Sequence, residues 1–138
     1  MIYLTRKETF NAAHRLYNEH WSDEQNFEVF GKCANKNWHG HNFNLFVTVK
    51  GIPNPETGFV INVKELGKII KEKIILRLDH TNLNLDDNFL PKNAQPTCET
   101  LVVAIWNELH PILTEKGCIL HAVKIQETEH ITAEYFGE

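Results

Sequence analysis

Histidine is the residue type with the clearest chemical potential, and the chain of 138 residues carries eight of them. His39 and His41 are separated by one residue in a stretch predicted to be a β-strand, so both imidazoles leave the same face. His14 ends an earlier predicted strand and reaches the same point if the two strands are neighbours. Three neutral imidazoles with one open position are the usual ligands of a catalytic zinc ion, which without a carboxylate ligand would keep its full double charge. Taken alone, a His-x-His pattern is more often a chance occurrence on a solvated strand than a pair of metal ligands. The surrounding residues must therefore decide whether it binds metal.

A cysteine precedes this strand. Cys33 is separated from His39 by five residues, and Lys32 stands directly before it. A thiol beside a divalent cation and a lysine should have its pKa lowered from the free value of about 8.5, which makes it a usable base or nucleophile. The alternative, a small buried apolar residue, is weak for Cys33 in a polar loop but is favoured for Cys98 and Cys118.

Carboxylates at three further places could take part in catalysis or binding, but each also has a purely structural interpretation. Asp79 and His80 follow a predicted helix, where the carboxylate can poise the imidazole for proton transfer or the helix dipole can simply favour histidine. Glu127, at the end of a predicted strand, could accept two parallel hydrogen bonds from a guanidine-like heterocycle edge or could be solvated. Glu99 lies in the first turn of a predicted helix, where the dipole stabilises it in any case. The histidines without partner spacing are interpreted as surface or structural: His20, His110, His121 and His130.

The composition narrows the class of protein. A hydrophobic content of 42% in this length is enough for one domain, residues 1–138, with a core of its own. The net charge of −4, without a basic stripe, argues against nucleic acid as a partner. No targeting segment or membrane-spanning stretch is predicted, and three unpaired cysteines suit the reducing cytoplasm.

The elements that must position these residues follow from hydrophobic periodicity. The expected order is ββααββ, an α+β fold in which a four-stranded antiparallel sheet carries both helices on one face. Unprotected edge strands predict continuation into a neighbouring subunit, and therefore a homo-oligomer. The polar loop over 15–37 contains a possible short helix near 22–30. The other expected ranges are strands at 2–13, 39–50, 118–127 and 130–136, and helices at 62–78 and 97–115.

Short motifs that carry these residues are spread over nearly the whole chain. They are Phe10-Asn11-Ala12-Ala13-His14-Arg15-Leu16, Phe30-Gly31-Lys32-Cys33, His39-Gly40-His41-Asn42, Leu78-Asp79-His80-Thr81-Asn82-Leu83, Pro96-Thr97-Cys98-Glu99 and Glu127-Thr128. In this order they resemble the 6-pyruvoyltetrahydropterin synthases and the related 6-carboxytetrahydropterin synthases, which share the tunnelling fold.

The resemblance implies a role for each matching position. His14, His39 and His41 would bind zinc, Cys33 would be the catalytic base, and Asp79 and His80 would act with it from an adjacent subunit. Glu127 would anchor the pterin ring. The lining of the pterin pocket would come from Thr97, Cys98 and Glu99, where the relatives have a hydroxyl residue at position 98.

The resemblance also implies a substrate and an assembly. The substrate is 7,8-dihydroneopterin triphosphate, which loses triphosphate without an organic cofactor, and trimers close a barrel and stack into a homohexamer. Arg15 and Lys32 flank the expected site and are our candidates for holding the triphosphate.

Three functions stay open at this point. The pyruvoyl synthase is favoured because five residues separate Cys33 from His39, whereas the carboxy synthases of queuosine biosynthesis, which release acetaldehyde, typically have three. The third is a non-catalytic pterin-binding module that keeps its metal as a structural device, against which the presence of Cys33 argues.

Overall fold

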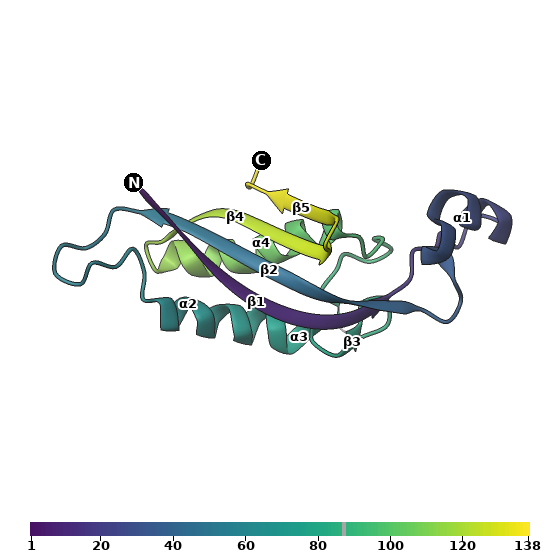
Figure 1. Ribbon diagram of the computed structural model, residues 1–138, viewed down its shortest axis with the longest axis horizontal. Helices are drawn as coiled ribbons and strands as arrows, with labels where there is room; N and C mark the ends of the chain where they lie inside the picture. Colours follow the sequence, from purple (N-terminus) through teal and green to yellow (C-terminus); the bar gives the residue numbers. More distant parts are fainter. Residues whose placement is uncertain (87) are drawn as a thin grey trace.

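The central element is a mixed five-stranded sheet with the strand order β3-β1-β2-β4-β5 (Figure 1). The computed structural model describes residues 1–86 and 88–138. The strands are β1 (Ile2–His14), β2 (His39–Gly51), β3 (Thr81–Asn82), β4 (Ile119–Thr128) and β5 (Ile131–Tyr135).

The pairing of β1 with β2 places the two predicted metal-ligand strands side by side. They run antiparallel along their whole length, with His14 opposite His39 and Phe10 opposite Phe43. The expected count of four antiparallel strands is wrong, because β3 forms a fifth strand that pairs in parallel with Ala12 and Ala13 of β1. A strand of 2 residues carries no alternating pattern, so only the return of the chain to the edge of β1 reveals it.

The first predicted amphipathic helix forms as one continuous helical run. It comprises α2 (Val63–Ile70), a π-helical segment η2 (Lys71–Ile75) and α3 (Leu76–Leu78). Asn62 begins it, as expected, because its side-chain oxygen accepts the N–H of Lys64 at 2.9 Å.

The second predicted helix is α4 (Cys98–Glu115), which begins after Thr97. Figure 1 shows α2, α3 and α4 on one face of the sheet, as the periodicity predicted. Within the described parts of the chain, no helix is long and apolar enough to cross a membrane.

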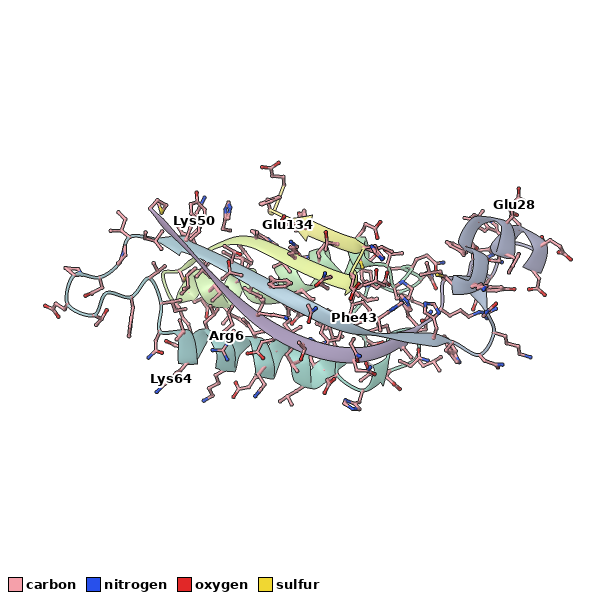
Figure 2. All side chains as sticks on the ribbon, viewed as in Figure 1. Arg6, Glu28, Phe43, Lys50, Lys64 and Glu134 are labelled. Atoms are coloured by element: carbon pink, nitrogen blue, oxygen red, sulfur yellow. The ribbon has the colours of Figure 1, made fainter. Side chains whose placement is uncertain are left out.

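The hydrophobic core fills the space between the sheet and these helices. Burial alternates along β1 and β2, so every second side chain points toward the helices. Phe10 and Phe43 stack there with ring centroids 4.8 Å apart, and Figure 2 labels Phe43 where the two strands run together. His14, His39 and His41 continue the same alternation, so they face the helix-covered side of the sheet.

The segment between β1 and β2 lies beyond the end of the sheet, where Figure 1 shows α1 apart from the other helices. The expected short helix is present as α1 (Asp23–Phe30), which is capped by Ser22. A 3₁₀ turn, η1 (Gly31–Ala34), follows it and contains Cys33. Gly31 allows this change of direction because its φ of 58° is a conformation that other residues rarely adopt.

Candidate functional site

The structure brings the three sequence-predicted histidines together. His14, His39 and His41 each offer one ring nitrogen, and these atoms all lie within 4.8 Å of one another. The ring centroids of the three pairs are 4.6, 5.1 and 5.0 Å apart. The convergence follows from the register, because His14 pairs with His39, and His41 lies two residues further along the same face of β2.

The surroundings of His14 orient its ring. Only 2% of the residue is exposed, and its Nδ1–H donates to the backbone carbonyl of Pro96 at 2.7 Å. This bond leaves Nε2 as the bare nitrogen that turns toward the other two histidines. The Pro96 carbonyl was not predicted from the sequence, since a backbone group gives no side-chain signal.

The cluster has the properties of a cation site. Nε2 of His14 and both ring nitrogens of His39 are buried and make no hydrogen bond to any described residue. Buried polar atoms normally have partners, and a metal ion would supply one for these nitrogens. Burial lowers the pKa of His14, His39 and His41, which keeps them in the neutral form that metals bind. The donor set therefore fits a metal ion.

Glu127 lies closer to this cluster than expected. Its Oε1 is 3.4 Å from Nε2 of His14 and 3.4 Å from Nε2 of His41, and 14% of its side chain is exposed. The ligand group consists of the three histidines, as expected, but the expectation that an ion here would keep its full double charge is wrong, because this carboxylate lies beside them. Its negative charge raises the pKa values of these two imidazoles, but the opposing effect of burial is larger. An ion bound here would be partly neutralised by Glu127.

Cys33 is held beside the end of β1 by backbone contacts. Its carbonyl accepts the N–H of Leu16 at 2.9 Å, and Nε of Arg15 donates to the carbonyl of Ala34 at 2.8 Å. The residue is half-buried and its thiol is free. The loop with Cys33 is thus attached to the residues that directly follow His14.

The three positions expected to line the pterin pocket have different surroundings. Burial and the carboxylates of Glu127 and Glu99 raise the pKa of the Cys98 thiol to about 12, so it stays protonated at neutral pH. The Thr97 hydroxyl accepts the N–H of Thr100 at 3.3 Å and caps α4. Glu99 is exposed and lines a cavity of about 600 Å³ on the side of α4 that also carries Glu108.

Asp79 and His80 form a pair at the edge of β1 that faces away from β2. The Asp79 carboxylate lies 2.9 Å from Nδ1 of His80, whose side chain is 82% exposed. It also accepts the backbone N–H of Asn11 at 2.8 Å, and this bond and the bond from His80 hold its pKa below the usual range. The pair is oriented but points to solvent, so it is not part of the histidine cluster of its own chain.

The two basic residues considered for an anion are placed differently. Arg15 lies over the ring of Tyr17 at 3.9 Å and lines a polar cavity of about 1020 Å³ together with Lys92 and His20. Lys32 is exposed and is not among the residues that line this cavity.

Comparison with known proteins agrees with this arrangement. A family model described as 6-pyruvoyl tetrahydropterin synthase matches residues 3–138. The chain is similar to the 6-pyruvoyl tetrahydrobiopterin synthase of Drosophila melanogaster, with 43% identity over 137 residues, 99% of this chain and 80% of the relative. With the Homo sapiens protein of the same name it shares 41% identity over 135 residues, 98% of this chain and 91% of the relative.

A solved structure gives the same result at the level of the fold. The Caenorhabditis elegans 6-pyruvoyl tetrahydropterin synthase superimposes with a TM-score of 0.90 at 34% identity, covering 99% of this chain and 96% of that chain. Fold and site together define an α+β protein with a candidate metal centre on its sheet. The chain belongs to the 6-pyruvoyl tetrahydropterin synthase family, and it is an enzyme of that family.

Proposed function

We propose that the chain converts 7,8-dihydroneopterin triphosphate to 6-pyruvoyltetrahydropterin with loss of triphosphate, in a zinc-dependent reaction. The observation that carries this proposal is the convergence of His14, His39 and His41, with unpartnered ring nitrogens, beside Glu127 and the loop that holds Cys33. The names of the relatives support it, since both are called 6-pyruvoyl tetrahydrobiopterin synthase. In this proposal residues 1–138 form a single pterin synthase domain.

The three histidines would hold the zinc ion. His14 would bind through Nε2, because its Nδ1–H is already donated to Pro96. A bound zinc ion supplies a Lewis acid that polarises oxygen atoms of the substrate. The protein's own part is to keep the imidazoles neutral by burial and to hold their orientation.

The other residues divide the remaining work. Cys33, on the turn η1 that is attached to Leu16, would take a proton from a carbon of the substrate side chain. Glu127 would accept hydrogen bonds from the pterin ring, beside Thr97, Cys98 and Glu99. Because Cys98 stays protonated, its thiol can donate a hydrogen bond, which a hydroxyl residue would do at this position in the relatives.

The substrate's triphosphate needs positive charge in a chain of net charge −4. Arg15 is the better of our two candidates, because its guanidinium is held by the Ala34 carbonyl and the Tyr17 ring and lines a cavity. Lys32 lies outside the lining of that cavity. An arginine fixed in this way is suited to bind phosphate oxygens.

The product decides between the functions that the sequence left open. Purified chain incubated with zinc and 7,8-dihydroneopterin triphosphate should release triphosphate and yield the pyruvoyl product, which chromatography with mass spectrometry identifies. Acetaldehyde with the carboxy product would contradict the proposal in favour of the carboxy synthase. Binding of the pterin without turnover would indicate the non-catalytic module.

Asp79 and His80 would complete the site of an adjacent subunit in a homohexamer. Their pair is oriented and largely exposed, and the sheet ends in the open edges of β3 and β5. An edge with free backbone groups favours pairing with another chain. The exposed pair on one chain and the Cys33 loop on another would then form one active site.

Mixing two inactive variants tests this shared site. Cys33→Ala and His80→Ala chains, dissociated and reassembled together in equal amounts, should recover about a quarter of the wild-type rate, because half of the chains supply each intact partner at random. The measurement is the steady-state rate after subunit exchange has been shown by native mass spectrometry. Exchange without recovered activity would place the whole site within one chain.

A further inference from the structure

The backbone of β1 continues to be paired after the strand ends at His14. Residues 15–17 run beyond the sheet, and Leu16 donates its N–H to the carbonyl of Cys33 on the side of β2. On the opposite side β3 pairs only with Ala12 and Ala13, and none of the strands described in the structure continues along Arg15 and Tyr17. Two amide side chains occupy that edge instead, Asn84 and Gln95.

Each amide makes two reciprocal hydrogen bonds with one backbone residue. Asn84 accepts the N–H of Arg15 at 2.9 Å and donates to the carbonyl of Arg15 at 2.9 Å. Gln95 accepts the N–H of Tyr17 at 3.1 Å and donates to the carbonyl of Tyr17 at 2.9 Å. A neighbouring strand would form the same bonds with every second residue of this segment. The two side chains therefore take the place of such a strand.

The pairing connects the two parts of the candidate site. Gln95 directly precedes Pro96, whose carbonyl accepts Nδ1–H of His14. The same extended segment carries Leu16, which holds Cys33 from its other edge. Gln95 is therefore linked to one metal-ligand candidate and, through the backbone of residues 16 and 17, to the candidate base.

We infer that Asn84 and Gln95 are positioning residues, which fix the orientation of His14 and the place of Cys33 by serving as the missing strand beside residues 15–17. The inference rests on the proposed function for the roles of His14 and Cys33. The hydrogen bonds of the two amides go to the backbone of Arg15 and Tyr17, so both act through the backbone and through the Pro96 carbonyl.

Gln95→Met tests the inference, because methionine keeps the size of the side chain and removes both hydrogen bonds. Zinc-loaded full-length chain is titrated with a chelator of known affinity, and the rate of Cys33 alkylation by iodoacetamide is measured by peptide mass spectrometry. We expect zinc affinity to fall about 10- to 100-fold, as when a partner that orients a metal ligand is lost. Alkylation of Cys33 should become severalfold faster, since the loop loses its support.

Gln95→Glu and Asn62→Ala provide the comparisons. Gln95→Glu keeps the acceptor for the N–H of Tyr17 and should fall between wild type and Gln95→Met in both measurements. Asn62 also binds a backbone N–H, but at the start of α2, so Asn62→Ala should change neither. Wild-type zinc affinity and thiol reactivity in folded Gln95→Met would overturn the inference, as would equal effects of Gln95→Met and Asn62→Ala. Neither measurement needs substrate, so a chain that lacks the proposed activity still gives a result.

Discussion

Replacing Cys33 with alanine is expected to lower kcat by roughly 10²–10⁴, the usual contribution of a positioned acid or base, while zinc content stays unchanged. The reason is that metal binding and proton transfer are assigned to different residues. The ring nitrogens that would bind metal belong to histidines, and Cys33 lies outside their cluster on the neighbouring turn η1. Substrate affinity should also persist, because the groups proposed to hold the pterin are elsewhere.

Zinc content, ligand affinity and the pH dependence of the rate would be measured on both proteins. If Cys33 is the base, the pH dependence of the rate of Cys33→Ala should differ from that of the wild type. Cys118→Ala is the matched control, since this thiol is buried with 7% exposure and burial raises its pKa. A Cys33→Ala enzyme with near-normal kcat would mean that another group, such as His80, takes the proton.

Replacing His39 with alanine is expected to reduce bound zinc from about one ion per chain to near zero and to abolish activity, because only two imidazoles would be left. His39 is the ligand candidate with both ring nitrogens unpartnered among the residues that the structure describes, so its ring has no other bond to keep it in place. Metal analysis of the purified protein gives the content directly.

Two controls separate loss of a ligand from loss of fold. His130→Ala removes an exposed histidine in the turn between β4 and β5 and should retain zinc and activity. Circular dichroism should show the same secondary structure for both variants, since the core does not depend on His39. Normal zinc content in His39→Ala would contradict the assignment of the cluster as the metal site.

Much of the arrangement follows from local sequence patterns. The alternation of side chains along a strand determines that His39 and His41 share a face, and the helical repeat determines the run that begins after Asn62 and the one that begins after Thr97. The strand alternation and the helical repeat both depend only on the backbone geometry of neighbouring residues. For the same reason the short helix capped by Ser22 could be located from the sequence.

The contacts that complete the site come from the tertiary structure alone. Pro96 is 82 residues from His14, and Gln95 is 78 residues from Tyr17. No sequence pattern predicts either interaction, because one partner of each is a backbone group that every residue possesses. The position of Glu127 beside His14 and His41 depends likewise on the register of β4 against β2, which no single strand specifies.

The sequence by itself therefore determined the residue types, the fold class and the face on which the histidines lie, since these depend on local backbone geometry. Only the tertiary structure decided that a fifth strand borders β1, that Glu127 stands beside the cluster and that two amides extend the sheet past His14. The physical reason is that each of these contacts joins segments that are far apart in the sequence. In the unfolded chain many chemically equivalent groups could make the same contact, and only the packing of the folded chain selects one of them.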